Sequence, residues 1–403
     1  MLLKSIGVAG LAAILAVNCP GQQLPSRSNQ MQAALQFEQQ GKIADAEAAW
    51  EAVLKARNDD FEAYAHLGIL ESRQEHYKKA IAYYRKALQL RPNVPAVEVN
   101  LGLSLFKSGD LRGAIQTFGP LLKTEPSSSP EAIRLVTLVG LAHYGLGEYA
   151  AAVPYLKRAV AGDPGKPPLL MALAQSCLSS RQYQCVLDVY REILAINPDS
   201  AEADVLAGEA YDELKNDAGA LAQFQAAVKA DPKLPNVHFG YGYLLWKANR
   251  YSDAEKELKA ELANNPENPL ALAYLGDIAI KLNHPAEAMP YLESAAQLLP
   301  SLAIAHLDLG IGYESAGRQA DALRELERAE SLTPDDPGVH WNLGRLYQSM
   351  GQKAEAKAEF EKTRNLQNAT QKSLREQMHQ VETKPSELEG GKGPRQGTTG
   401  TLQ

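Results

Sequence analysis

A single glycine recurs through most of this 403-residue chain at intervals of 34 residues, each time after another nonpolar or aromatic residue. So regular an interval predicts an array of similar supersecondary units, each stacked on its neighbours. The spacing rises to 38 residues once and doubles to 68 once, and Ala174 stands in the middle of the doubled interval. The glycines are Gly68, Gly102, Gly140, Gly208, Gly242, Gly276, Gly310 and Gly344.

Further positions keep the same interval. A small residue stands twelve residues after each glycine and a large apolar residue sixteen after it, as Ala254 and Leu258 follow Gly242. A proline closes most units, as Pro266 does here. Apolar residues spaced by three and four indicate one face of a helix, and the late proline ends a second helix. The pattern therefore predicts pairs of helices whose backbones approach closely at the glycine.

This pattern resembles the tetratricopeptide repeat family, whose unit is a 34-residue helix-turn-helix. The resemblance covers residues 27–370 and implies an all-α fold, a right-handed α-solenoid of about ten stacked repeats. The expected repeats are about 27–60, 61–94, 95–128, 133–166, 167–200, 201–234, 235–268, 269–302, 303–336 and 337–370. Residues 371–383 are expected to form a capping helix, and residues 384–403, rich in Gly and Thr, a disordered tail.

The N-terminus has the features of an export signal. Lys4 supplies a positive charge, and residues 6–17 are an apolar run too short to span a bilayer. We expect a signal peptide over residues 1–19 and a tether over residues 20–26. Cys19 follows a segment that resembles a bacterial lipoprotein box, although Asn18 stands where that box has a small residue. Lipidation of Cys19 and an uncleaved anchor remain alternatives to cleavage.

Two cysteines follow the signal, Cys177 and Cys185, on either side of an expected helix-helix turn. An exported pair can oxidise. Cys185 is nevertheless one residue away from the face that should meet Cys177, and disulfide geometry is demanding. The sequence therefore favours two small buried residues over a disulfide.

The sequence shows no motif of a known catalytic or cofactor site. It lacks a phosphate-binding loop, a His-Glu-x-x-His, a Cys-x-x-Cys and a Gly-x-Ser-x-Gly. His238, His306 and His340 each occupy the fourth position of a repeat, which favours a structural column over a metal site. A net charge of −7 argues against a nucleic-acid partner. We expect no cofactor, no metal and no enzymatic activity.

The resemblance implies that positions 2, 5, 9, 12 and 13 of each first helix line a concave groove. Many of these positions are apolar or aromatic here, which is typical of a binding surface. The alternative is that these side chains pack against the neighbouring repeat. The candidate groove residues are Ile69, Phe106, Tyr144, Met171, Glu209, Asp212, Phe239, Tyr243, Trp246, Asp277, Ile311 and Trp341.

These observations predict a non-catalytic scaffold, exported to a bacterial periplasm or cell surface, that holds a protein or peptide in its groove. Membrane attachment is expected only through the N-terminal segment or Cys19. One alternative is an assembly subunit of an envelope export machine that acts through its convex face. A second is an enzyme that uses groove carboxylates such as Glu209 and Asp277, which the missing nucleophile and metal set disfavour.

Overall fold

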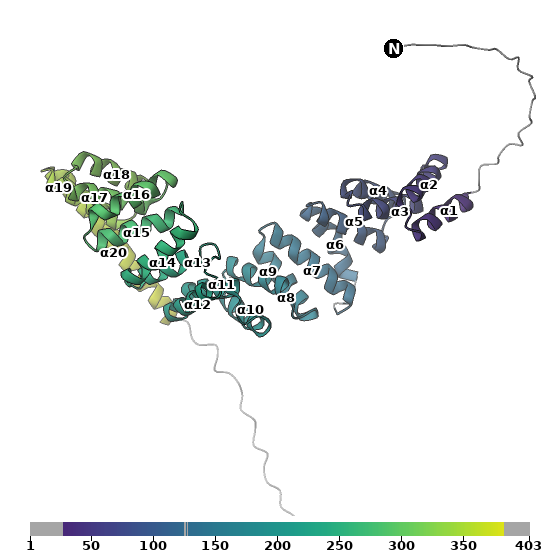
Figure 1. Cartoon of the computed structure of the whole chain (residues 1–403), viewed down its shortest axis with the longest axis horizontal. Helices are drawn as coiled ribbons and strands as arrows, with labels where there is room; N and C mark the ends of the chain where they lie inside the picture. The colour runs from purple at the N-terminus through teal and green to yellow at the C-terminus, as the bar shows by residue number, and fades with distance from the viewer. Residues whose placement is uncertain (1–26, 125, 127, 383–403) are drawn as a thin grey trace, which may run out of the picture. The chain divides into compact units, whose positions relative to one another are not determined.

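The computed structural model describes residues 27–124, 126 and 128–382, and this part of the chain forms twenty α-helices and no strand (Figure 1). The helices are α1 (Arg27–Gln39), α2 (Ile43–Ala56), α3 (Phe61–Arg73), α4 (Tyr77–Leu90), α5 (Pro95–Lys107), α6 (Leu111–Thr124), α7 (Pro130–Gly145), α8 (Tyr149–Gly162), α9 (Pro167–Ser179), α10 (Tyr183–Ile196), α11 (Ala201–Glu213), α12 (Asp217–Ala230), α13 (Val237–Lys247), α14 (Tyr251–Asn264), α15 (Pro269–Lys281), α16 (Pro285–Leu298), α17 (Ala303–Ser315), α18 (Gln319–Leu332), α19 (Pro337–Ser349) and α20 (Lys353–Glu382). Odd and even helices alternate as the first and second helices of ten hairpins. The expected all-α solenoid is therefore confirmed.

Each hairpin turns through one residue in the left-handed backbone region. Seven of these ten residues are Gly or Asn, which tolerate positive φ, and they include Gly109 and Asn249. Glu75, Arg181 and Lys215 take the same conformation in the other three hairpins, with φ between 58° and 62°. The repeat therefore imposes this backbone conformation. Gly and Asn are favoured at this position, but other residue types also adopt it.

The recurring glycine gives the two helices of a hairpin their close contact. A Cβ added at Gly242 would lie 2.9 Å from Cγ of Leu258, and one at Gly276 would lie 2.3 Å from Cδ2 of Leu292. In both cases the large residue stands sixteen positions after the glycine, so it fills the space that the missing side chain leaves. This contact explains why the two positions recur together in the sequence.

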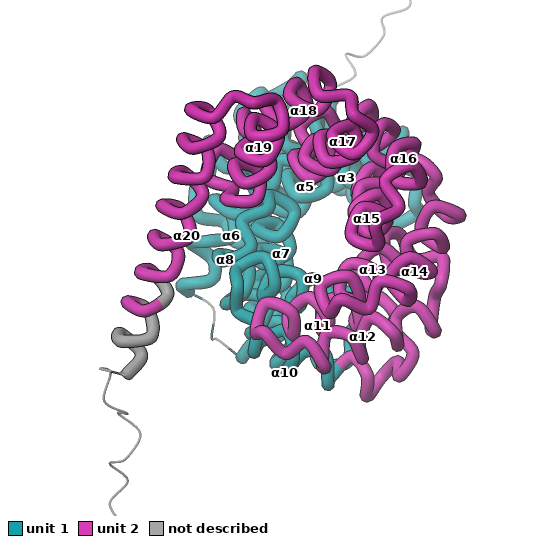
Figure 2. Tube along the Cα trace, turned by 90° about the vertical axis from the view of Figure 1, so that its left-hand side faces the viewer, with its two compact units in different colours: residues 1–192 teal, residues 193–403 magenta. Residues whose placement is uncertain are grey.

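The chain divides into two compact units, residues 1–192 and residues 193–403 (Figure 2). In unit 1 the buried core includes Trp50, Tyr84 and Phe118, and in unit 2 it includes Leu258 and Leu326. Within unit 2, α13, α15 and α17 lie on the inner side of the curve and α14, α16 and α18 on the outer side (Figure 2). We call the side formed by α11, α13, α15 and α17 the inner face of unit 2.

The structure differs from two expectations drawn from the sequence. Cys177 and Cys185 form a disulfide between α9 and α10, with their Cα atoms 5.9 Å apart, so the prediction of two unpaired residues was wrong. The left-handed Arg181 reverses the chain between these helices and brings the cysteines together. Residues 371–382 continue α20 without a break, whereas a separate capping helix was expected.

The export signal, Cys19, the tether over residues 20–26 and the tail over residues 384–403 lie outside the described residues. Among the described helices, none combines the length and the hydropathy that a bilayer crossing requires. This finding concerns the repeats only.

Candidate interaction surface

The twelve predicted groove residues are spread over the first helices of nine repeats, and the structure brings only some of them together. In unit 1, Ile69 lies with Leu103 and Tyr84 in a hollow of about 300 Å³ between α3 and α5. Phe106 is half-buried against the same core, and Tyr144 packs edge-on against Tyr149 of α8. Met171, on α9, is half-buried. These residues form no shared constellation of polar groups.

In unit 2, Phe239, Tyr243 and Trp246 on α13 meet Tyr274 on α15, and we call these four residues the aromatic cluster. The ring centroids of Tyr243 and Trp246 are 5.8 Å apart, and that of Tyr274 lies 4.7 Å from Trp246 and 5.4 Å from Tyr243. All four side chains are half-buried. The cluster therefore joins two repeats and also leaves aromatic surface open to a ligand.

Tyr274 was not among the predicted residues because it occupies position 6 of its repeat, outside the positions that the family resemblance assigns to the groove. Partial burial and the nearby Tyr243 and Asp277 raise the pKa of its hydroxyl to about 12. The hydroxyl therefore stays protonated at neutral pH and can donate a hydrogen bond.

Beside the aromatic cluster lie two buried carboxyl groups, Asp277 on α15 and Asp308 on α17, which we call the carboxylate pair. Each residue is 3% exposed. Asp277 accepts a hydrogen bond from Nε1 of Trp246 at 2.5 Å and one from Nζ of Lys281 at 2.7 Å. The Lys281 ammonium also lies 5.6 Å from the centroid of the Trp246 ring, within the range of a cation–π contact.

Asp308 differs from Asp277 in having a buried oxygen, Oδ2, without a hydrogen-bond partner in the described part of the chain. Burial, followed by the charge of Asp277, raises its pKa well above the ordinary value, and Lys281 partly offsets this rise. A carboxyl group in such a place favours its protonated form. The sequence alone offered no signal for this residue, since position 6 has no family role in the groove.

The other predicted carboxylates lie on α11. Asp212 pairs with Nζ of Lys247 at 2.5 Å, and the same lysine reaches Asp217 at 3.2 Å. Glu209 is exposed to solvent. Surrounding protein removes part of its hydration and raises its pKa, and no charge among the described residues offsets this rise. Ile311, half-buried on α17, and Trp341, 51% exposed on α19, complete the predicted set without joining the aromatic cluster.

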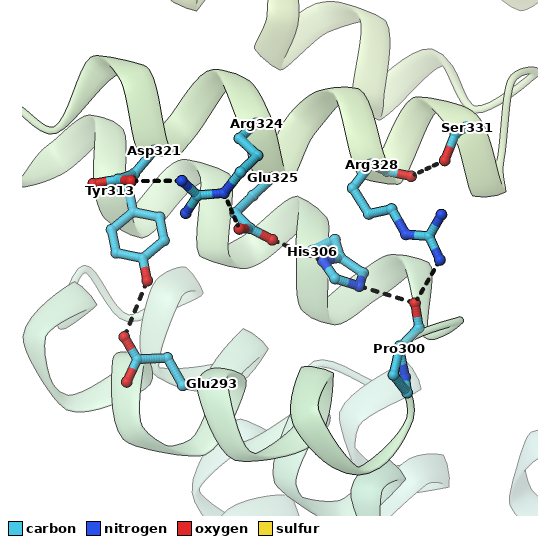
Figure 3. Close-up of polar contacts among 9 residues, drawn as sticks. All are labelled: Glu293, Pro300, His306, Tyr313, Asp321, Arg324, Glu325, Arg328 and Ser331. Atoms are coloured by element: carbon cyan, nitrogen blue, oxygen red, sulfur yellow. Dashed lines mark hydrogen bonds and ion pairs between the residues drawn. The ribbon is translucent and has the colours of Figure 1, made fainter.

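The three histidines at the fourth position of their repeats form matching pairs with carboxylates. Nδ1 of His238 lies 2.7 Å from Glu257, that of His306 2.8 Å from Glu325 and that of His340 2.7 Å from Glu359. Each partner stands nineteen residues later, on the second helix of the same hairpin. Nε2 of His306 donates to the carbonyl of Pro300, so the ring ties the hairpin to the preceding loop (Figure 3).

The last of these pairs has a second carboxylate beside it. Glu330 lies 3.8 Å from Nδ1 of His340, and these two residues with Glu359 form a group that has the ligand types of a metal site. Nζ of Lys362 contacts both carboxylates, at 3.1 Å from Glu330 and 2.8 Å from Glu359. Because the lysine already supplies the cation and the His–Glu pair recurs in other repeats, we assign these histidines a structural role.

A second hollow lies on the outer side of unit 2, between α12, α13 and α14, and measures about 730 Å³. Tyr241 lines it together with the charged residues Lys229, Arg250, Asp253 and Glu257. Tyr241 and Tyr243 are two residues apart on α13 and both half-buried, yet the first faces this hollow and the second belongs to the aromatic cluster.

Curated proteins with similar sequences include one from a plant and one from a bacterium. The chain is 24% identical over 278 residues to the Protein CTR9 homolog of Arabidopsis thaliana, covering 67% of this chain and 25% of that protein. It is 27% identical over 124 residues to the type IV pilus assembly protein PilF of Pseudomonas aeruginosa, covering 30% of this chain and 49% of PilF. The chain thus spans between a quarter and about half of the length of these relatives.

Among solved structures, the chain resembles a tetratricopeptide repeat protein from Parabacteroides merdae, with a TM-score of 0.47 and 18% identity over 67% of this chain and 98% of that one. It also resembles PilF of Pseudomonas aeruginosa, with a TM-score of 0.44 and 19% identity over 54% of this chain and 97% of that one.

The sequence profile of the tetratricopeptide repeat matches residues 31–95, 99–167, 171–235 and 241–303, and a second profile, described as TPR repeat, matches residues 313–351. The first profile alone covers more than half of the chain. Its matches fall on the helical hairpins that the structure shows. The chain therefore belongs to the tetratricopeptide repeat family.

Proposed function

We propose that this protein is a non-catalytic scaffold that binds a protein partner on the inner face of unit 2, with the aromatic cluster at the centre of the contact. Membership of the tetratricopeptide repeat family supports a role in protein–protein interaction. The observation that carries the choice of surface is the half-buried aromatic cluster beside the carboxylate pair. Partly exposed Trp and Tyr side chains are the residues that most often dominate binding energy at interfaces.

The proposed location is outside the cytoplasm. The charged and apolar N-terminal segment supports export, and so does the disulfide between Cys177 and Cys185, because disulfides persist mainly in oxidising compartments. Anchoring through Cys19 and a soluble exported form are both compatible with this proposal.

The outer hollow favours a second candidate, an assembly subunit that meets its partner through the outer side of unit 2. Its volume of about 730 Å³ and its mixed charged and aromatic lining are suited to a side chain or loop of another protein. The two candidates differ in which side of α13 touches the partner.

Tyr243 and Tyr241 provide a matched pair for the test. A photocrosslinking phenylalanine derivative is incorporated at either position, and cells that produce the full chain are irradiated. Covalent adducts at position 243 and none at position 241 are expected if the inner face binds the partner. Adducts at position 241 alone would favour the outer side, and adducts at neither position would contradict both candidates.

A further inference from the structure

Two cations in unit 1, Arg73 and Lys107, have no ion-pair partner in the described part of the chain. Each stands at position 13 of its repeat, in the last turn of α3 or of α5, and both are exposed. They line the hollow of about 300 Å³ that also contains Ile69 and Leu103, which we call the unit 1 hollow. No Asp or Glu is among the described residues that line it. The two charges are therefore open to an anion from outside.

The same repeat position in unit 2 does have a carboxylate partner. Lys247 stands at position 13, and its Nζ lies 2.5 Å from Asp212, which is at position 12 of the preceding repeat. In unit 1 the residue that corresponds to Asp212 is Ser72, at position 12 of the repeat before that of Lys107. A neutral hydroxyl thus stands where the other unit has a carboxylate.

A second ion pair in unit 2 shows the same difference. Nζ of Lys281, also at position 13, lies 2.7 Å from Asp277 at position 9 of the same repeat. Position 9 in unit 1 is apolar, with Ile69 before Arg73 and Leu103 before Lys107. The repeat therefore holds a cation at position 13 within reach of carboxylates on the first helices, and around the unit 1 hollow those carboxylates are missing.

Hydrogen bonds between hydroxyl groups hold the walls of the hollow in place. Oγ of Ser104 donates to the carbonyl of Asn100 at 2.9 Å and lies 2.9 Å from Oγ of Ser72, which is 3.3 Å from the hydroxyl of Tyr84. Because each hydroxyl has one proton, Ser72 donates to Ser104 and Tyr84 donates to Ser72. These bonds join α3, α4 and α5, so the hollow is organised before a ligand arrives.

The remaining donors of the hollow surround an apolar surface. Besides the two cations they are the side-chain amide of Asn100 and the hydroxyl of Tyr77, which make no hydrogen bond among the described residues and are half-buried. Charged and neutral N–H and O–H donors of this kind bind a carboxylate. The half-buried side chains at position 9 offer contact to an apolar group beside it.

We propose that the unit 1 hollow binds an Asp or Glu side chain of a partner protein and that an apolar residue next to it in the partner contacts Ile69 and Leu103. The incoming carboxylate takes the place beside Lys107 that Asp212 has beside Lys247. This site goes beyond the proposed function, because it belongs to unit 1 and needs no residue of the aromatic cluster. The outcome of the crosslinking experiment therefore leaves it unaffected.

The test measures the affinity of the full chain for three synthetic dodecapeptides with blocked ends, in which Gly-Ser alternates with Leu-Glu, Leu-Gln or Leu-Lys. Calorimetry at low ionic strength is expected to show the tightest binding for the Leu-Glu peptide, weakened by added salt. The chain has a net charge of −7, so diffuse attraction alone would favour the Leu-Lys peptide. Binding of either control peptide as tightly as the Leu-Glu peptide would overturn the inference.

Three charge-removing variants locate the binding. Arg73→Met and Lys107→Met are each expected to weaken binding of the Leu-Glu peptide about two- to fivefold. Lys86→Met removes the same charge from an exposed position of α4 outside the hollow and is expected to leave the affinity unchanged. Equal weakening by all three variants would mean that net charge alone decides the affinity, and it would contradict a defined site.

A matched pair of variants at Ser72 tests where the carboxylate lies. Ser72→Asp supplies from within the chain the carboxylate that Asp212 provides in unit 2, so it should occupy Lys107 and weaken binding of the Leu-Glu peptide. Ser72→Asn disturbs the same hydroxyl groups without adding a charge, and it should bind the peptide about two- to fivefold more tightly than Ser72→Asp. Thermal unfolding checks that both variants fold, and equal affinities would contradict the proposed place of the carboxylate.

Discussion

Asp308 is the residue whose environment departs furthest from what its position in the repeat suggests. It is an acid on the first helix of a hairpin, buried beside a second acid, and the lysine near both of them hydrogen-bonds to Asp277. A buried, unpaired carboxylate is costly, so the folded chain holds the proton of Asp308 more tightly than the unfolded chain does. Its environment therefore makes stability depend on pH.

The expected direction follows from proton binding. Since the pKa of Asp308 is raised in the folded state, the folded chain binds more protons above the ordinary aspartate range, and stability falls as pH rises through the window up to the raised pKa. Asp308→Asn replaces the titrating carboxyl group with a neutral amide, whose contribution to stability does not change with pH. The free energy of unfolding of the variant minus that of the wild type should therefore be about 1–3 kcal/mol larger at about pH 8 than at about pH 4. Urea unfolding at both pH values measures this, and parallel pH profiles for the two proteins would contradict it.

At the scale of the element, the helical hairpin depends on the glycine of its first helix and the large residue of its second. Gly276 and Leu292 show the tightest form of this contact in unit 2, since an added Cβ would lie 2.3 Å from Cδ2 and 2.4 Å from Cγ of Leu292. Leu292 is fully buried, so it has little room to move. The hairpin therefore needs the absence of a side chain at this point.

Alanine substitutions at two helical glycines should differ in how much stability they cost. Gly276→Ala is expected to destabilise the protein by about 1–3 kcal/mol because Leu292 must shift. Gly119→Ala, in α6, meets no atom of a more distant residue within 4 Å, but Pro120 follows it and disfavours helical backbone for a residue with a Cβ, so a change in stability smaller than about 1 kcal/mol is expected. Thermal unfolding of both variants measures the difference, and a loss of stability of the same size in both would argue against the packing explanation.

At the scale of the whole molecule, the two units are built from the same kind of repeat and differ in the side chains on their first helices. Unit 1 contains the disulfide of the fifth hairpin, and unit 2 contains the aromatic cluster and the carboxylate pair. A repeat array draws its stability from each hairpin and from contacts between neighbours. A crosslink within one hairpin therefore acts mainly on that hairpin and its neighbours.

The oxidation state of Cys177 and Cys185 tests the proposed location. Both cysteines should resist alkylation in the full chain recovered from its native cells and should react when residues 1–19 are deleted and the chain stays in the cytoplasm. Reduction of the oxidised form should cost about 2–3 kcal/mol of stability. Peptide mapping of alkylated cysteines measures the state, and free thiols in the full chain would contradict the proposed export.

The local features of the fold could be predicted from the sequence because each one repeats. The hairpin boundaries follow from a 34-residue interval, and the turn at Gly109 or Asn249 follows from the backbone freedom of the residue. Of the candidate surface, Phe239, Tyr243, Trp246 and Asp277 were predicted to lie on the inner side, and the structure brings them together.

Other features depended on the tertiary structure. Tyr274 and Asp308 lie beside the predicted residues although both occupy position 6, and the cysteines paired although their helical phases argued against it. Helical periodicity assigns a residue to a side of its own helix, and it says nothing about the distance to a side chain about thirty residues away on the next repeat. Those distances are set by how the hairpins stack, so the sequence by itself determined the repeating frame, and the packing between repeats decided which polar and aromatic groups meet.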